Sequence, residues 1–400
     1  RAHMERALRE ERARGFRHGV EDQFEFMGKV GEGTYGVVKQ ARDKKSKAWL
    51  AIKTFKPPMR EGEGFNKDSI REIALLRELK HPNIINLREV ILCPPQPEWL
   101  SGQSGSGLYL VFDYAEHDLC EMLKYHRERK KPTTEVFVKS VLWQILNGLQ
   151  YLHSNWVIHR DLKPSNILVM GRRSGIVDEV GHVKLADFGM ARIFQAPVRE
   201  LNQDGIVVTI WYRAPELLLG AAHYTKAIDV WAVGCIFAEL ITTEPLFRGH
   251  EEKGKPVVQQ DQLDKIFQVL GVPTFENWQG ASALKHANIL KSTLESKKHA
   301  KPWGLEKVLR DKAPHLSTSF FKEAVALLTR MLQFDPVNRI TALEALRHNF
   351  FEHEPRPQEN VLACDGEWEA YPQRKVAPDE PVAPRPGADP SARPAKMLKR

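Results

Sequence analysis

Four polar side chains in the middle of the chain have the types and spacing needed to handle a phosphate group. The run HRDLKPSN places Asp161 two residues before Lys163 and five before Asn166, and the run DFG begins at Asp187. The Asp161 carboxylate can orient a hydroxyl nucleophile and accept its proton, while Lys163 can reach the group being transferred. Asn166 and Asp187 offer the oxygen ligands that Mg²⁺ prefers. In this order the residues predict magnesium-assisted phosphoryl transfer without a covalent enzyme intermediate.

A glycine-rich run and a lysine upstream could hold the other phosphates. Gly31, Gly33 and Gly36 lie in GEGTYGVV, and glycine lets a backbone approach phosphates closely. A tight hairpin explains the same pattern, so alone it is weak evidence. Lys53 ends the apolar run LAIK, where a buried ammonium group needs anionic partners such as phosphates or Glu72. An exposed lysine at a strand edge is the alternative.

The elements that would position these residues change along the chain. Short β-favouring runs fill 24–113, with one helical pattern over 69–80. A strand, not a helix, follows the glycines, which argues against a dinucleotide-binding fold. Longer helical patterns dominate after 118. We predict an α+β protein with a β-rich lobe over 24–115, carrying one helix, and a mostly α-helical lobe over 116–353.

The two ends differ from this central region. Residues 1–20 are charged and helix-favouring, which predicts an N-terminal helical extension. Residues 355–400 hold nine of the 25 prolines and little apolar periodicity. A disordered, proline-rich tail is therefore expected over 354–400.

Composition bounds the possible partners. With 42% hydrophobic and 28% charged residues in 400, the chain fits a globular protein of two domains or lobes. No apolar run approaches the roughly 18 residues that span a bilayer, so no membrane partner is expected. The four cysteines lack CxxC spacing, which indicates neither a zinc site nor a disulfide framework and favours a reducing compartment.

The net charge of +8 comes partly from basic patches at 124–131 and 285–312. Such patches attract acidic surfaces or nucleic acid in general, but a solvated lysine-rich surface explains them as well. No nucleic-acid motif accompanies them, so no specific nucleic-acid site is predicted.

Taken together, the motifs resemble those of the eukaryotic protein kinases over roughly 24–351. REIALLRELKHPNI and WYRAPELLLG resemble the cyclin-facing helix and the activation-segment end of cyclin-dependent kinases. LVFDYAEHDL, LHSNWVIHRDLKPSNILVMG and LLLGAAHYTKAIDVWAVGCIFAEL are similar, more narrowly, to the group that associates with Mediator and pairs with cyclin C. Phe188 of DFG matches the plant-type form. The run KDSIRE departs from the family's PSTAIRE signature but keeps Arg71 and Glu72.

The resemblance implies a bilobal protein kinase fold and a cyclin-dependent serine/threonine kinase of the nucleus that uses ATP and Mg²⁺. Implied partners are a cyclin of C type, the Mediator kinase-module subunits, and protein substrates with Ser/Thr-Pro sites, including the RNA polymerase II tail. A cell-cycle or mitogen-activated kinase and a non-catalytic pseudokinase are the alternatives. The absent TxY pair argues against the mitogen-activated type, and the complete catalytic set argues against a pseudokinase.

The resemblance also implies the residues of a nucleotide site. Phe112 would lie behind the adenine, Asp113 and Ala115 would present hinge backbone groups, and Asp118 would contact the ribose. Thr34 and Tyr35 match positions that accept inhibitory phosphates in cell-cycle relatives. The implied ATP contacts are Val30, Gly31, Glu32, Gly33, Thr34, Tyr35, Gly36, Val38, Ala51, Lys53, Phe112, Asp113, Tyr114, Ala115, Asp118 and Leu168.

Further implied roles concern catalysis and the substrate. Lys53 would form an ion pair with Glu72, and Asn166 and Asp187 would bind Mg²⁺. Thr209 would hydrogen-bond Asp161 and Lys163. A pocket for the proline after the phosphorylated residue would involve Val208 and Arg213, and Glu216 would pair with Arg339 as a structural tie.

The activation segment lacks its usual switch, because 187–208 contains no Ser, Thr or Tyr. In typical cyclin-dependent kinases three arginines bind a phosphothreonine, whose place is taken here by Asp204. One carboxylate supplies about −1 charge against the −1.5 to −2 of a phosphate. We therefore predict that Asp204 is a partial stand-in, completed by Glu200 or by an acidic group of a partner; alternatively, Asp204 is an ordinary turn residue. The matching arginines are Arg71, Arg160 and Arg192.

Overall fold

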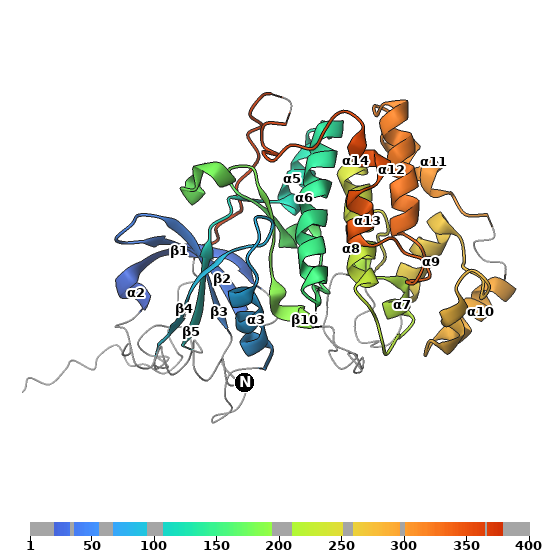
Figure 1. Ribbon diagram of the computed structural model, residues 1–400, viewed down its shortest axis with the longest axis horizontal. Helices are drawn as coiled ribbons and strands as arrows, with labels where there is room; N and C mark the ends of the chain where they lie inside the picture. The colour runs from blue at the N-terminus through green and yellow to red at the C-terminus, as the bar shows by residue number, and fades with distance from the viewer. Residues whose placement is uncertain are drawn as a thin grey trace, which may run out of the picture.

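The computed structural model describes residues 20–32, 36–55, 67–93, 107–193, 210–250, 259–296, 301–364 and 366–378. Within them a sheet-rich lobe is followed by a helical lobe (Figure 1). The predicted two-lobed α+β architecture is confirmed. The expected N-terminal extension over 1–20 lies outside the described residues, apart from Val20.

The N-terminal lobe is built on one antiparallel sheet in the order β1-β2-β3-β5-β4. Both faces of the central β3 are buried, because Ala51 and Phe55 join the large core while Leu50 and Ile52 join a second cluster. This explains the continuous apolar run in that strand. The strands are β1 (Phe24–Glu32), β2 (Gly36–Asp43), β3 (Trp49–Phe55), β4 (Leu87–Leu92) and β5 (Leu108–Asp113), and the short helix α2 (Val20–Gln23) precedes them.

Among the described residues of this lobe, one longer helix, α3 (Lys67–Glu78), accompanies the sheet. Leu75, Leu76 and Leu79 are buried in the large core, in the spacing that gives a helix one apolar face. Glu72 lies one turn before Leu76 and is also buried, at 2% exposure. The hydrophobic face therefore directs a carboxylate toward the sheet.

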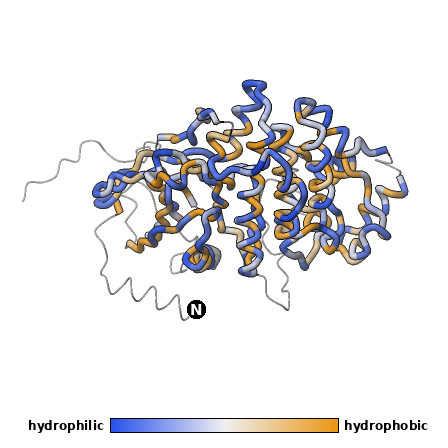
Figure 2. Tube along the Cα trace, turned by 45° about the horizontal axis from the view of Figure 1, so that its top comes forward, coloured by the Kyte–Doolittle hydropathy of each residue, from blue (hydrophilic) through white to orange (hydrophobic). Residues whose placement is uncertain are grey.

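The C-terminal lobe packs its helices around α8, in which every residue is buried. Figure 2 shows the hydrophobic positions gathered between the helices, with hydrophilic positions on the outside. In the described part of the chain, no helix combines the length and apolarity needed to cross a bilayer. The helices are α5 (Leu119–Glu128), α6 (Glu135–Ser154), α7 (Pro215–Leu218), α8 (Ala227–Thr242), α9 (Gln260–Leu270), α10 (Ala287–Glu295), α11 (Leu305–Lys312), α12 (Thr318–Met331), α13 (Ala342–Leu346) and α14 (Asn349–Glu352).

Short strands and 3₁₀ turns connect the longer elements. One small sheet has the order β6-β8-β9, and β10 pairs with β7 in another. These strands are β6 (His117–Asp118), β7 (Val157–Ile158), β8 (Ile167–Val169), β9 (Val183–Leu185) and β10 (Arg192–Ile193). The 3₁₀ turns are η1 (Pro164–Asn166), η2 (Arg172–Ser174), η3 (Val177–Glu179), η4 (Phe188–Met190), η5 (Ile210–Tyr212) and η6 (Gln279–Ala283).

Residues 354–378 correct the expectation of a disordered tail over 354–400. Val361, Leu362, Cys364 and Tyr371 are buried against the C-terminal lobe. The prolines misled the prediction, because the aromatic and aliphatic residues among them provide surface to bury. In Figure 1 this red segment leaves the helical lobe and returns to the sheet-rich lobe. Residues 379–400 lie outside the described part.

Candidate functional site

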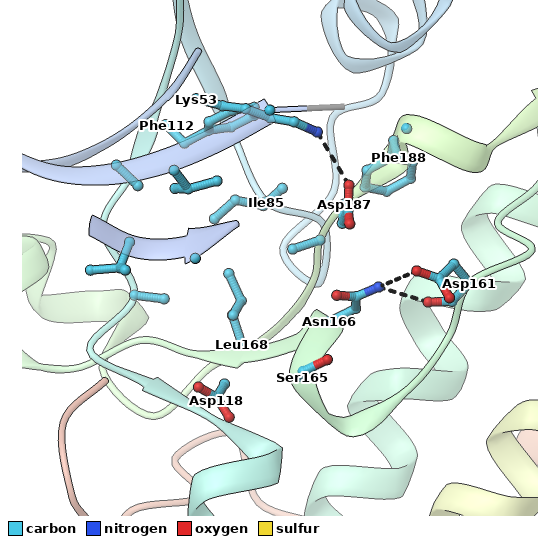
Figure 3. Close-up of a pocket in the computed structure, with 18 of the residues that line it drawn as sticks. Lys53, Ile85, Phe112, Asp118, Asp161, Ser165, Asn166, Leu168, Asp187 and Phe188 are labelled. Carbon is cyan, nitrogen blue, oxygen red and sulfur yellow. Dashed lines mark hydrogen bonds and ion pairs between the residues drawn. The ribbon is translucent and has the colours of Figure 1, made fainter. Parts of the chain in front are cut away.

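A cavity of ≈ 520 Å³ lies between the two lobes and collects most of the predicted site residues. Figure 3 shows Lys53 entering from the sheet, with Asn166 and Asp161 coming from the C-terminal lobe. The predicted residues that line the cavity are Val30, Gly31, Glu32, Gly36, Val38, Ala51, Lys53, Glu72, Phe112, Asp113, Ala115, Asp118, Asp161, Lys163, Asn166, Leu168 and Asp187.

Some predicted site residues are not placed at the cavity. Tyr114 is 1% exposed and does not belong to the lining; its ring lies 6.5 Å from that of Trp49. Others lie outside the described residues, so their roles stay predictions: Gly33, Thr34, Tyr35, Glu200, Asp204, Val208 and Thr209.

Lys53 forms the charged centre of the upper wall. Its ammonium group donates to both oxygens of Glu72, at 2.7 and 3.0 Å, and to Asp187 Oδ1 at 3.2 Å. Burial disfavours the charged ammonium, but the two carboxylates outweigh burial and raise the pKa of Lys53. The prediction that this buried lysine needs anionic partners is confirmed. A fixed positive charge therefore faces the cavity.

Asp187 is held in an unusual backbone conformation. Its φ is 64° and ψ is 75°, in the left-handed region that costs a non-glycine residue energy. The 3₁₀ turn η4 then buries Phe188, whose ring lies 5.0 Å from that of His159. The Asp187 side chain is 46% exposed, because it faces the cavity. The charge of Lys53 lowers the pKa of Asp187, so this carboxylate stays ionised.

Asp161, Lys163 and Asn166 form one hydrogen-bonded group on the opposite wall. Lys163 Nζ donates to Asp161 Oδ2 at 2.8 Å. The Asn166 amide donates to the Asp161 carbonyl oxygen at 2.8 Å and to its Oδ2 at 3.0 Å. Burial raises the pKa of Asp161, and the neighbouring Lys163 opposes that rise. In its ionised form, a partly desolvated carboxylate is suited to accept a hydroxyl proton.

A residue that the sequence did not single out holds this loop in place. Asp229, fully buried in α8, accepts hydrogen bonds from the backbone N–H groups of His159 at 2.9 Å and Arg160 at 2.8 Å. It also bonds His153 Nε2 at 3.0 Å. Arg160 has a positive φ of 73°, so the two bonds to Asp229 offset a strained backbone. The sequence feature that could have identified Asp229 is a lone aspartate in the very apolar run AIDVWAVG, because a buried carboxylate needs hydrogen-bond partners.

The donor atoms at the cavity floor suit a divalent cation. The Asn166 Nδ2 atom is turned toward Asp161, which leaves its amide oxygen on the side away from Asp161, as Figure 3 shows. The Asp187 carboxylate faces the same cavity, and both are hard oxygen ligands of the kind Mg²⁺ prefers. No cluster of three or more His, Cys, Asp or Glu in the described ranges could hold a metal alone. The residues therefore fit an ion that takes its remaining ligands from phosphate oxygens and water.

Gly36 has a structural reason to be glycine, apart from any ligand. A Cβ at this position would overlap with the carbonyl oxygen of Thr54 on β3. At Gly31 the nearest atom to such a Cβ would be Arg374 Nη2, at 3.7 Å. Gly36 is thus required by strand packing, whereas at Gly31 a Cβ would make only an ordinary van der Waals contact with Arg374.

Several further residues reach the cavity that sequence reasoning missed. Ile85 and Ala186 add to its apolar wall, and Arg374 comes from the segment expected to be disordered. At the hinge, the Asp113 side chain pairs with Arg88 and accepts from Asn86 Nδ2 at 3.1 Å, so this side chain ties β5 to the start of β4. Trp368 and Tyr371 were the available signal for order in the tail, because disordered segments are poor in aromatics.

The activation-segment arginines lie on elements that meet around η4. α3 carries Arg71 and packs against η4, while β10 carries Arg192 and follows η4 directly. Arg160 donates to the carbonyl oxygen of Met190, the last residue of η4, at 3.3 Å. Their predicted joint binding of an acidic group stays a prediction, because Asp204 lies outside the described residues.

The end of that segment is tied down as predicted. Arg339 donates to both carboxylate oxygens of Glu216, at 2.8 and 3.0 Å. Both side chains are buried, at 0% and 4% exposure. Arg213 comes directly after η5, and its backbone N–H donates to the Ile210 carbonyl at 3.1 Å; its predicted part in a proline pocket is untested.

Comparison with known proteins agrees with this geometry. The protein kinase domain family matches residues 24–351. Cyclin-dependent kinase E-1 of Arabidopsis thaliana is 48% identical over 362 residues, which cover 88% of this chain and 72% of that protein. The probable cyclin-dependent kinase 8 of Dictyostelium discoideum is 47% identical, covering 87% and 86%. Cyclin-dependent kinase 8 of Drosophila melanogaster is 43% identical, covering 90% and 76%.

Proposed function

Because the chain belongs to the protein kinase family, and within it to the cyclin-dependent kinase 8 group, it is a cyclin-dependent serine/threonine kinase; we propose the residues, substrates and partners through which it acts. The observation that carries the residue assignment is the pair of charged groups facing each other across the cavity. Lys53, Glu72 and Asp187 form one group, and Asp161, Lys163 and Asn166 form the other.

ATP would lie with its base among the apolar residues and its phosphates between the two charged groups. Val38, Ala51, Phe112 and Leu168 line the apolar end. Lys53 lies beyond them, where its charge would orient the α- and β-phosphates. Because Glu72 holds the ammonium group in place before ATP binds, little reorganisation is needed at the moment of reaction.

Transfer would take place beside Asp161. Its Oδ2 atom orients the substrate hydroxyl and accepts the proton, while Lys163 stabilises the charge that spreads over the transferred phosphoryl group. Asn166 fixes the Asp161 side chain through Nδ2 and, with Asp187, would hold magnesium. Bound Mg²⁺ would neutralise phosphate charge. The contact of Lys53 with Asp187, and that of Asp229 with the loop before Asp161, keep the catalytic side chains in position between turnovers.

The substrate class follows from the family assignment. We propose Ser/Thr-Pro sites, with the RNA polymerase II tail and transcription factors as targets, acted on in the nucleus as part of the Mediator kinase module. A cyclin binds the face that carries α3, and a C-type cyclin is the proposed partner. The contact between Glu72 and Lys53 supports cyclin binding at this face, because the position of α3 determines whether Glu72 is buried against Lys53.

Activation would need charge from outside the chain. Arg71, Arg160 and Arg192 lie on elements that meet around η4, and Asp204 supplies one carboxylate where relatives carry a phosphate. An acidic group of a further partner would complete the site. The lone chain is then nearly inactive, and cyclin with that partner raises activity without phosphorylation of 187–208.

The test uses the chain co-purified with a C-type cyclin, radiolabelled ATP and peptides that repeat the RNA polymerase II tail. Mg²⁺-dependent transfer to Ser-Pro peptides is expected, with little transfer to matched Ser-Ala peptides. Asp161→Asn should abolish transfer while nucleotide binding persists. Undiminished transfer by that variant would overturn the assignment of Asp161, and equal use of both peptides would overturn the proline preference. Full activity of the chain without any partner would contradict the activation proposal.

A further inference from the structure

We call residues 366–378 the strap. The strap connects the two lobes across the mouth of the cavity. Its first half is anchored on the C-terminal lobe. Tyr371 is buried, and its hydroxyl lies 2.9 Å from His126 Nε2. Glu369 pairs with Lys131 and accepts from the Tyr125 hydroxyl at 2.6 Å. This end of the strap is held by buried aromatic surface as well as by hydrogen bonds.

The middle of the strap follows the hinge between the lobes. The Arg374 N–H donates to the Glu116 carbonyl oxygen at 2.8 Å, and Gln373 Nε2 donates to Glu116 Oε2 at 3.2 Å. His117 Nδ1 donates to the carbonyl oxygen of Pro372 at 2.8 Å. Glu116 and His117 directly follow Ala115, which lines the cavity. The strap therefore runs beside the segment about which the lobes would open.

The far end of the strap pairs with β1, the edge strand next to the glycine-rich run. Lys29 N donates to the Ala377 carbonyl and Ala377 N donates to the Lys29 carbonyl, both at 2.8 Å. β1 pairs with β2 on its other side, so the strap covers its outer edge. At Gly28, where φ is +139°, a Cβ would lie 2.5 Å from the Ala377 carbonyl oxygen. The backbone of β1 thus leaves room for the strap.

Arg374 adds a second link between the lobes, inside the cavity. Its Nη2 atom donates to the Val30 carbonyl oxygen of β1 at 3.4 Å. Its Nε atom lies 3.7 Å from Asp118 Oδ2, at the start of α5 in the C-terminal lobe. The Arg374 side chain is 14% exposed and lines the cavity. It therefore bridges the strand above the cavity and the helix below it.

We propose that the strap holds β1 closed over the bound nucleotide, so that the nucleotide leaves only after the strap detaches from β1. β1 covers the cavity, and lifting it would break both Lys29–Ala377 hydrogen bonds and the Arg374 bridge. The C-terminal anchor at Tyr371 stays in place during this motion, which makes the strap a tether rather than a loose tail. By linkage, a nucleotide that favours the closed lobes also favours the attached strap.

The inference rests on the proposed nucleotide site, and the experiment separates the two. A fluorescent N-methylanthraniloyl derivative of ADP, with Mg²⁺, is bound to the chain–cyclin complex, and its dissociation is followed by stopped flow. Truncation after Pro372 keeps the Tyr371 anchor but removes both links to β1, and it should speed dissociation on the order of 10-fold. Arg374→Ala removes the side-chain bridge, and Ala377→Pro removes one of the two Lys29–Ala377 hydrogen bonds; each should have an effect of roughly 3-fold.

Lys375→Ala is the matched control, because it removes a neighbouring positive charge from an exposed strap residue; its rate should equal that of the unaltered complex. Hydrogen exchange provides a second readout: ADP should slow exchange of the Lys29 and Ala377 amides in the unaltered complex, and should slow it less in Arg374→Ala. Equal dissociation rates for all forms would refute the proposed role of the strap in nucleotide release, while leaving the proposed nucleotide site intact. Failure of every form to bind the probe would instead overturn the proposed site.

Discussion

Removal of Glu216 should destabilise the C-terminal lobe strongly. Its partner Arg339 has no exposed side-chain surface, and its guanidinium group donates to both carboxylate oxygens. Arginine cannot lose its proton to escape burial, so Glu216→Ala leaves an unpaired cation in a dry site. Breaking a buried pair in this way costs about 3–5 kcal/mol of unfolding free energy.

The expected cost converts to a measurable shift in thermal unfolding. At roughly 2.1 cal/mol/K per residue, residues 24–351 have an unfolding entropy of about 0.7 kcal/mol/K. Glu216→Ala should therefore lower the midpoint of thermal unfolding by about 4–7 °C, measured by calorimetry on the chain–cyclin complex. Glu276→Ala removes an exposed carboxylate of the same lobe and is the control, with a change within about 0.5 kcal/mol.

A double variant tests the physical reason. Glu216→Leu with Arg339→Met removes both charges and should recover part of the loss, because apolar replacement of a buried pair is often close to neutral. Recovery stays incomplete, since Arg339 also donates to the carbonyl oxygens of Ala227 at 2.8 Å and Gln333 at 3.0 Å. If Glu216→Ala costs less than about 1 kcal/mol, or if the separate costs of Glu216→Leu and Arg339→Met simply add in the double variant, the reasoning is refuted.

Three further predictions concern the cavity and the hinge. Lys53→Met should lower kcat by on the order of 10²–10³-fold in a peptide kinase assay, and an unchanged kcat would remove Lys53 from the mechanism. Burial raises the pKa of Asp161 above 3.8, so its ionised form is lost at a higher pH than in a free aspartate and the acid limb of kcat/KM should lie above pH 3.8. Lys163→Met removes the charge that opposes this rise and should move the limb further up; a downward shift would contradict the assigned interaction. Gly171→Ala would bring a Cβ into overlap with the Glu116 carboxyl group and should cost about 1–3 kcal/mol of stability in urea unfolding, whereas a neutral result would show that this carboxyl moves freely.

The sequence alone determined the parts of the site that are close together along the chain. Asp161, Lys163 and Asn166 lie within six residues, so the turn η1 is enough to bring them into one hydrogen-bonded group. Lys53 was identifiable because a lysine in an apolar strand needs a buried anion. The change from strand-like to helical patterns likewise predicted the two lobes, since both periodicities are local properties of the chain.

Only the tertiary structure decided which distant residues complete the site. Asp229 reaches the catalytic loop from α8, about 70 positions away, because α8 is buried on all sides and holds this hydrogen-bonded carboxylate inside the core. Arg374 reaches the cavity because Tyr371 and its neighbours bury apolar surface on the C-terminal lobe and bring the following residues across the hinge. Proline count and periodicity report the local preferences of the chain, whereas the positions of Asp229 and Arg374 depend on contacts made after the core has formed.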